Sequence, residues 1–382
     1  MKKIILFFPI FLLFSLNSSG QSNSVLASGD WYKISTKTNG IYKLDYSSIY
    51  SLGVNTDNLQ IKDIKLYGNG GGMLPKLNSD FRHNDLIENA IEIHDLNNNG
   101  IFESSDFILF YGESADNWVF NPTSSSFSHR INLFSDEVFY FLTINSQSAG
   151  KRIQEKMTLL NPTQTIKTFN DYAFHELELE NLIQSGQQWF GERFDYQSSQ
   201  SFNFTFPNLD QNSDVIITTE VAARSLLPSN FIITVNNTTL TSLSVPNIVS
   251  TYATEYAKIA SKTTIFNSNS SSINVGLEYS SSDNGAMSWL NYIEINARRK
   301  LRMSGNSMLF RDATATNLTV GRFELENALG ITVWDITNPQ NVELLPVLLN
   351  EDVLSFNDSL NTIHEYIAFN SLSYLTPELK GP

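Results

Sequence analysis

The sequence predicts a mainly all-β protein with two antiparallel β-rich domains, the second resembling a sandwich or jelly roll. Three observations support this fold class. Short runs alternate between apolar and polar residues, clusters of Asn, Gly and Ser separate these runs, and helical periodicity is weak. Many short strands at such spacing are typical of sandwiches, and only a few short helices are expected.

The composition indicates a folded chain and excludes several kinds of site. Of its 382 residues, 41% are hydrophobic and 12% aromatic, too much apolar surface for a disordered protein. At roughly 150 residues per domain, this length predicts about two domains. The absence of cysteine excludes a thiol nucleophile and a disulfide scaffold. The formal net charge of -14 argues against nucleic acid as a partner, because phosphate binders need a basic surface.

Residues 1–20 have the pattern of a secretory signal peptide. Two lysines follow the first residue, residues 4–16 form an apolar run, and the small residues Ser18 and Gly20 follow. The run is shorter than the roughly 20 residues that a membrane-spanning helix needs. No cysteine follows it, so it is not a lipoprotein signal. We therefore expect an exported protein, and the alternative, a buried strand of the fold, is weaker.

The N-terminal β-rich domain is predicted over residues 21–150. Asn39 and Gly40 lie between its first two strands and predict a hairpin turn there. Residues 46–52 have a weak helical pattern, and the polar stretch 145–150 marks the domain boundary. The expected strands are residues 31–34, 41–44, 61–67, 90–94, 106–111 and 138–144.

The second, sandwich-like domain is predicted over residues 151–382. Asn236 and Asn237 lie between two threonine-rich apolar runs and predict a second hairpin turn. A weak helical pattern is present at residues 174–182. The expected strands are residues 201–206, 214–221, 231–235, 273–279, 289–297, 319–325 and 331–336.

The sharpest local motif is a calcium-type loop at residues 95–106. It matches D-x-N-x-N-G with a carboxylate at position twelve, and Gly100 at position six permits a sharp bend. The flanking segments are strands, so the motif is not an EF-hand, and the low ligand charge suits millimolar extracellular calcium. An Asx-rich hairpin loop without metal is the alternative. The predicted ligands of a structural Ca²⁺ are the side chains of Asp95, Asn97, Asn99 and Asp106 and the carbonyl of Ile101.

Two further segments have simpler interpretations that we favour. The glycine-rich residues 67–75 could cradle phosphate only at the start of a helix, and the sequence favours a wide turn there. The basic run 297–302 could face an anionic partner such as lipopolysaccharide or another protein. A strand end with solvated or paired arginines is the favoured alternative.

The sequence contains no convincing active site. Its five histidines are isolated from one another, and neither a G-x-S-x-G elbow nor an H-E-x-x-H motif is present. Serine hydrolase chemistry is therefore disfavoured, and structural roles are expected for the histidines.

Nine segments, in order along nearly the whole chain after residue 20, carry a resemblance to a known family. They are GDWYKI (29–34), GIYKL (40–44), LYGNGG (66–71), NDLIENA (84–90), DFILFYG (106–112), YFL (140–142), SGQQWFGE (185–192), LNYIEINARR (290–299) and VWDIT (333–337). Together they resemble the surface sortase of the type IX secretion system of Bacteroidota, a gingipain-like cysteine peptidase of several domains.

The resemblance implies that this chain is the N-terminal accessory region of such a sortase. The family's Cys/His peptidase domain lies after the region covered here, so no catalytic residue is carried over and no catalysis is expected from this chain itself. In an intact member, the peptidase removes the C-terminal sorting signal of secreted cargo and transfers the cargo to anionic lipopolysaccharide at the cell surface.

The partners implied by this resemblance are cargo proteins with a C-terminal sorting domain, lipopolysaccharide, and a barrel protein that holds the sortase on the outer membrane. A second hypothesis stays open at this point. Sandwich domains with a calcium loop and aromatic side chains also serve as stand-alone surface adhesion or carbohydrate-binding modules.

Overall fold

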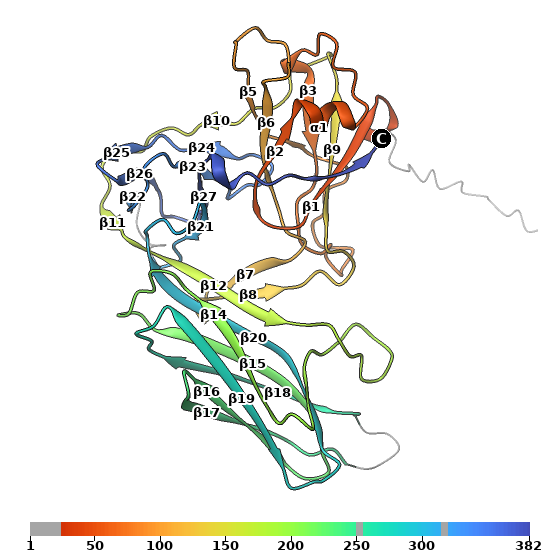
Figure 1. Cartoon of the computed structure of the whole chain (residues 1–382), viewed down its shortest axis with the longest axis vertical. Helices are drawn as coiled ribbons and strands as arrows, with labels where there is room; N and C mark the ends of the chain where they lie inside the picture. The colour runs from red at the N-terminus through yellow and green to blue at the C-terminus, as the bar shows by residue number, and fades with distance from the viewer. Residues whose placement is uncertain (1–23, 250–254, 315–319) are drawn as a thin grey trace, which may run out of the picture.

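The computed structural model describes residues 24–249, 255–314 and 320–382, which are arranged almost entirely as β-strands (Figure 1). The predicted signal peptide lies outside these residues. In the described part, helical structure is limited to α1 (Tyr46–Ser51) and the 3-10 turns η1 (Val25–Ala27), η2 (Ile61–Asp63) and η3 (Ser371–Ser373). None of these is long and apolar enough to cross a membrane.

Two facing sheets form an N-terminal sandwich, with strand orders β28-β1-β9-β3-β4 and β2-β6-β5. Ile34 and Leu142 from the first sheet share a core with Leu44, Ile108 and Phe110 from the second. The chain's last strand, β28, pairs with β1, so the C-terminus lies beside the first strands (Figure 1). The strands are β1 (Trp31–Thr36), β2 (Gly40–Asp45), β3 (Ile64–Tyr67), β4 (Glu88–Asn89), β5 (Glu92–His94), β6 (Phe107–Gly112), β9 (Val138–Ile144) and β28 (Glu378–Gly381).

The longest strands form a central sandwich, at the bottom of Figure 1. Its four-stranded sheet, β14-β19-β16-β17, packs on the strands β12-β20-β15-β18 of a ten-stranded sheet. Residues alternate between buried and half-buried along β16, and Phe231 and Ile293 are fully buried in the shared core. The strands are β12 (Thr168–Glu176), β13 (Arg193–Phe194), β14 (Ser199–Thr205), β15 (Val215–Arg224), β16 (Ser229–Val235), β17 (Thr238–Val245), β18 (Lys258–Phe266), β19 (Ser272–Ser281) and β20 (Met287–Lys300).

The rest of the ten-stranded sheet, β10-β24-β23-β27-β21, belongs to a C-terminal sandwich and packs on the sheet β11-β22-β26-β25. Its core is aromatic: the rings of Phe323 and Phe356 stack with centroids 5.0 Å apart. Asn170 of β12 pairs with Arg311 of β21, which makes the sheet continuous between the two sandwiches. The strands are β10 (Gln154–Glu155), β11 (Gln164–Ile166), β21 (Ser307–Arg311), β22 (Val320–Leu325), β23 (Thr332–Asp335), β24 (Glu343–Leu344), β25 (Leu348–Asn350), β26 (Val353–Ser359) and β27 (Glu365–Phe369).

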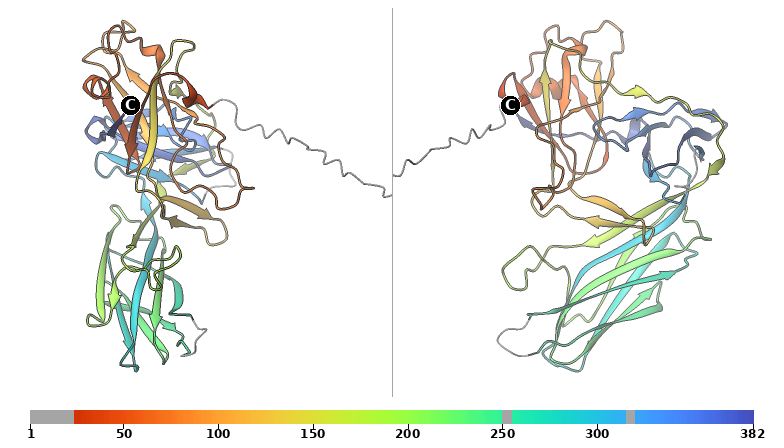
Figure 2. Two further views of the ribbon diagram at one scale, coloured as in Figure 1. Left: turned by 90° about the vertical axis from the view of Figure 1, so that its right-hand side faces the viewer. Right: turned by 180° about the vertical axis from the view of Figure 1, so that it is seen from behind.

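A hairpin of β7 (Asn117–Asn121) and β8 (Ser126–Arg130) connects the N-terminal and central sandwiches. The three views place it between the two bodies, against β12 and β20 (Figures 1 and 2). Two hydrogen bonds fix it there: Phe127 N–H donates to Asn296 Oδ1 (2.7 Å), and Asn296 Nδ2 donates to the Phe127 carbonyl (2.9 Å).

The structure confirms the mainly all-β fold class with antiparallel sheets, and every predicted strand range overlaps an observed strand. The hairpin at Asn236 and Asn237 is also confirmed: it joins β16 to β17, and both residues have positive φ (48° and 65°). The predicted division at residue 150 stays a prediction. The structure adds that residues 378–381 pair with the N-terminal sheet.

Two local predictions are wrong. The strands on either side of Asn39 and Gly40 do not pair with each other, because β1 lies between β28 and β9 whereas β2 pairs with β6. Residues 174–182 are not helical: β12 runs to Glu176, paired with β20 along its whole length, and irregular backbone follows. The helical pattern at 46–52 is confirmed by α1, which Asp45 caps by accepting the Ser48 N–H at 2.8 Å.

Candidate functional site

The predicted calcium-type loop joins β5 to β6 at one end of the N-terminal sandwich. Its bend requires two residues with left-handed backbone, Asn98 (φ 57°) and Gly100 (φ 78°). These conformations fold the segment 95–101 into a tight, exposed turn. The sequence motif therefore correctly located a special backbone, whichever function the loop has.

The three predicted side-chain ligands near the start of the loop all turn towards its backbone. Asp95 Oδ2 accepts the Gly100 N–H at 2.8 Å, and Asn97 Oδ1 accepts the Asn99 N–H at 3.1 Å. Asn99 Oδ1 in turn accepts the Ile101 N–H at 2.7 Å. These bonds preorganise the side-chain oxygens on the inside of one turn. Each oxygen retains further lone-pair capacity, as hydrogen-bonded carboxylates and amides do.

The far end of the loop is fixed by Asp106, which is 1% exposed. Its carboxylate accepts the N–H groups of Leu96 (3.0 Å) and Glu103 (2.8 Å), which ties the two ends of the loop together. The backbone of Ile101 forms an isolated bridge with Gln60. The structure therefore brings the predicted residues into one small loop. In it, the carboxylate oxygens of Asp106 accept backbone N–H groups and close the loop.

Sequence reasoning missed Glu103 in this loop. Its Oε2 accepts hydrogen bonds from the side-chain amides of Asn97 (2.5 Å) and Asn99 (3.2 Å), so it faces the same turn. Position nine of a twelve-residue calcium loop commonly takes part in binding through water, and that spacing was the available signal. The donor set is all oxygen, from carboxylates, amides and a carbonyl, and fits a hard cation such as Ca²⁺.

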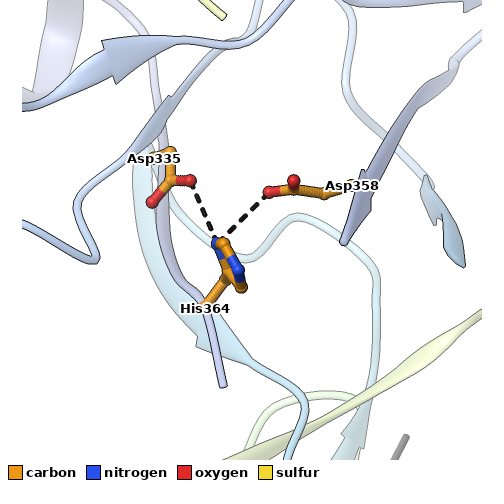
Figure 3. A group of neighbouring side chains, drawn as sticks. All are labelled: Asp335, Asp358 and His364. Carbon is orange, nitrogen blue, oxygen red and sulfur yellow. Dashed lines mark hydrogen bonds and ion pairs between the residues drawn. The ribbon is translucent and has the colours of Figure 1, made fainter. Parts of the chain in front are cut away.

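A different group has acidic and histidine ligand atoms within 4.8 Å of one another: Asp335, Asp358 and His364 in the C-terminal sandwich (Figure 3). His364 Nδ1 lies 3.2 Å from Asp335 Oδ2 and 3.5 Å from Asp358 Oδ2. Lys156 Nζ contacts the same two oxygens at 2.5 and 2.7 Å. Because the lysine already supplies a cation to both carboxylates, a metal ion would have to displace it.

This group is best explained as an internal ion network. Asp335 ends β23 and Asp358 lies on β26, so Lys156 links the two sheets of the C-terminal sandwich. Burial opposes the charge on Lys156, but its bonds to the two aspartates outweigh burial and raise its pKa. Burial likewise opposes the charge on Asp335, yet the bonds from His364 and Lys156 hold its pKa well below the usual range. The charges are therefore mutually satisfied, as buried charges must be.

The basic run at the end of β20 is paired with acids inside the molecule. Arg298 Nη1 lies 3.0 Å from Asp312 Oδ1, and Arg299 Nη1 lies 2.8 Å from Asp171 Oδ2. Arg299 is also buried. These two arginines tie β20 to its neighbours, which agrees with the favoured interpretation of a strand end.

The histidines of the described residues contact carboxylates or aromatic rings, and none there hydrogen-bonds a serine hydroxyl. His129 of β8 is the most enclosed: its Nε2 lies 2.6 Å from Glu176 of β12 and its Nδ1 lies 2.7 Å from Glu294 of β20. Burial lowers the pKa of His129, but the two carboxylates outweigh burial and raise it to about 9. The imidazolium thus holds the β7–β8 hairpin against the central sandwich.

Comparison with known proteins adds a fold relationship. No family model matches the sequence, and no curated protein does either. Among solved structures, dimeric latent PorU from Porphyromonas gingivalis matches 94% of this chain with a TM-score of 0.78 and 20% sequence identity. The chain shares the fold of PorU. It spans 33% of the PorU chain, so the likeness concerns that part of PorU only.

Two other solved structures match much more weakly than PorU does. The insecticidal delta-endotoxin Cry8Ea1 from Bacillus thuringiensis covers 63% of this chain and is matched over 43% of its own, at 12% identity and a TM-score of 0.24. An isomalto-dextranase of Arthrobacter globiformis complexed with panose covers 63% and is matched over 33%, at 12% identity and a TM-score of 0.19. We base no inference on scores this low.

Proposed function

We propose that this chain is the β-rich accessory region of a type IX secretion sortase. The observation that carries the proposal is the PorU fold over 94% of the chain, since PorU is a sortase of that system. The sequence resemblance supports it independently. Its segments include strands of all three sandwiches, and Phe110, Leu290 and Trp334 within them are at most 1% exposed.

The proposed role is to position other parts of the secretion machinery rather than to perform the chemistry. The sortases of this family use a cysteine, and this chain has none. Its body is well suited to positioning, because the ten-stranded sheet is continuous through two sandwiches and the β7–β8 hairpin clamps the third against it. The proposed partners are cargo with C-terminal sorting domains, the outer-membrane barrel and lipopolysaccharide, and the proposed location is the cell surface.

The loop 95–106 adds a second part to the proposal, a structural Ca²⁺ site. Asp95, Asn97 and Asn99 with the Ile101 carbonyl would hold the ion, and Glu103 and Asp106 would supply the remaining charge. Support comes from the all-oxygen donor set and from the inward hydrogen bonding of its side chains. The ion would stiffen the connection from β5 to β6.

The accessory role is tested by deleting, in frame, the gene segment that encodes this chain in its host. Cargo should then retain its C-terminal sorting signal, which mass spectrometry of the surface proteins detects, and restoring the segment should restore cleavage. Normal cargo maturation after deletion would overturn the proposal. If saturable binding on a glycan array accompanied that result, the chain would instead be a carbohydrate-binding module.

The non-catalytic part is tested on the purified chain with a cargo protein that carries a sorting domain. Neither cleavage nor transfer of the cargo is expected at any concentration of the chain, because thiol chemistry needs a cysteine. Measurable turnover that survives repeated purification would contradict the proposed role.

A further inference from the structure

A cavity lies where the β7–β8 hairpin meets β12 and the segments that follow β6 and β23. Its volume is about 380 Å³, which lies within the range of small-ligand sites. It is lined by parts of the N-terminal, central and C-terminal sandwiches together. Neither the calcium-type loop nor the ion network at Lys156 contributes to it.

Aromatic rings form one wall of this cavity. Trp118 of the hairpin stacks on Tyr172 of β12, with centroids 3.8 Å apart and planes at 24°. Phe127 lies 5.2 Å from Tyr172 and 5.0 Å from Phe120, and all four residues line the cavity. The ring of Tyr172 is covered by Trp118 and by the guanidinium of Arg311, which lies 4.4 Å from its centroid. Because Trp118 and Phe120 remain partly exposed, their ring surface is available to a ligand.

The charged side chains in the lining are all acidic: Glu113, Asp116 and Glu365, with no Lys, Arg or His among the lining residues. Two of the three are already occupied. Glu365 Oε1 lies 3.3 Å from Nε of the buried Arg311, and Asp116 Oδ1 accepts the Asn132 N–H at 2.8 Å. Within the described part of the chain, no cationic side chain forms an ion pair with Glu113.

Glu113 is held in place by the glycine-rich segment. A Cβ on Gly70 would lie 2.4 Å from Glu113 Oε2, and one on Gly71 would lie 2.1 Å from the Ser114 carbonyl oxygen. Only glycine allows this close packing behind the acid. Burial raises the pKa of Glu113 to about 7, against the hydrogen bond from the Gly71 N–H. A half-buried carboxylate without a cationic partner is therefore held in the lining of an aromatic cavity.

We propose that this cavity binds an ammonium or guanidinium group carried on an aliphatic stem. The cation would lie over the exposed ring surface of Trp118 and Phe120 and neutralise Glu113, since aromatic faces and an unpaired carboxylate both attract positive charge. The group could belong to a lysine or arginine of a peptide or to a free amine. The proposal goes beyond the sortase-related function and does not depend on it.

The test is titration calorimetry and tryptophan fluorescence at pH 8 and low salt, where Glu113 is ionised. The probes are Nα-acetyl-lysine amide, Nα-acetyl-arginine amide, spermidine and maltose. We expect saturable binding of at least one cationic probe. Binding of the amides alone identifies a peptide side chain as the source, and binding of spermidine identifies a free amine.

Three variants make the test specific. Glu113→Gln keeps the shape and the bond from Gly71, and it should weaken binding roughly tenfold or more, as should Trp118→Leu. Asp57→Asn, which removes an exposed carboxylate outside the cavity, should leave binding unchanged. Thermal melts verify that each variant is folded. Failure of every cationic probe to bind, binding of maltose only, or unchanged affinity in Glu113→Gln would each overturn the proposal.

Discussion

At the scale of single residues, charge pairing explains most of the charged side chains that the fold buries. His129, Lys156, Arg298 and Arg299 each contact carboxylates on neighbouring strands or directly after one. In a chain of net charge -14, cations are scarce, and the structure uses these four to join strands. The half-buried Glu113, which receives no such partner, is therefore an informative exception.

The ionisation of His129 can be measured directly. An ordinary histidine has a pKa near 6.5, and the pKa of about 9 in the folded chain means that Glu176 and Glu294 stabilise the imidazolium. This stabilisation is fully present below about pH 6.5 and is lost as the pH rises through about 9, on the order of 3 kcal/mol in total. In an NMR titration, the ring should therefore change its chemical shift with a midpoint near pH 9.

Glu176→Gln is the control for this titration, because it removes one carboxylate and keeps the size of the side chain. The midpoint should move down towards the ordinary value. A wild-type midpoint at or below 6.5 would show that burial dominates and that His129 is neutral in the hairpin contact.

The calcium loop gives a second residue-level prediction. Calorimetry of the purified chain with CaCl₂ should give a saturable signal with a dissociation constant of roughly 10⁻⁴–10⁻³ M, the range of extracellular modules. Asp95→Ala should abolish it, because the first carboxylate of the loop is lost. Asp57→Asn is the matched control in another exposed loop. Equal heats of binding for Asp95→Ala and the wild-type chain would contradict the calcium site and favour the alternative, an Asx-rich turn without metal.

At the scale of elements, alternation of apolar residues predicts where strands lie but not which strands pair. The run 31–44 contains two strands and a turn dipeptide, and a local hairpin follows from local rules. The chain instead sends β1 and β2 into the two facing sheets, where Ile34 and Leu44 meet across the core. Segments 138–144 and 378–381 provide the partners of β1, and no local pattern contains that information.

The helix predicted at residues 174–182 is absent for a related reason. Tyr172 and Phe174 contact the ring of Trp118 on one face of β12, so this strand has bulky residues on the side that covers the hairpin. Its weak periodicity was overridden by nine consecutive pairs with β20. At Asn236 and Asn237 the turn joins two strands that pair with each other, so the local sequence was enough to predict this hairpin.

The central strand β20 allows a matched test of the core. Ile293 is 0% exposed between the two sheets of the central sandwich, and Ile293→Ala should lower the free energy of unfolding by about 2–5 kcal/mol. Ile265 on β18 has the same side chain but is 59% exposed, so Ile265→Ala should change it by at most about 0.5 kcal/mol. Chemical denaturation measures both. Equal losses in the two variants would contradict the assignment of these faces.

At the scale of the whole molecule, the described chain is three sandwiches joined by shared elements. The ten-stranded sheet serves two of them, and β28 returns from the C-terminal end to the N-terminal sheet. Length and composition predict about two domains, and neither contains information on a sheet assembled from β10, β12 and β27. Pairing between strands so far apart in sequence depends on how all the sheets pack against one another in the folded chain.

This connectivity predicts how the molecule unfolds. The central and C-terminal sandwiches should melt together because they share a sheet. The N-terminal sandwich is coupled to them partly through the two hydrogen bonds between Asn296 and Phe127. Asn296→Ala leaves these backbone groups without a partner at a cost of about 1–3 kcal/mol. Differential scanning calorimetry should then show an earlier, separate transition.

Asn274→Ala is the appropriate control for that experiment. Asn274 Nδ2 donates to Asn203 Oδ1 at 2.7 Å, but both residues lie in one sheet of the central sandwich. Its loss should shift the joint transition without separating another. If Asn296→Ala melts with the same single transition as the control, the hairpin contact does not set the coupling, and the shared strand β28 would have to provide it.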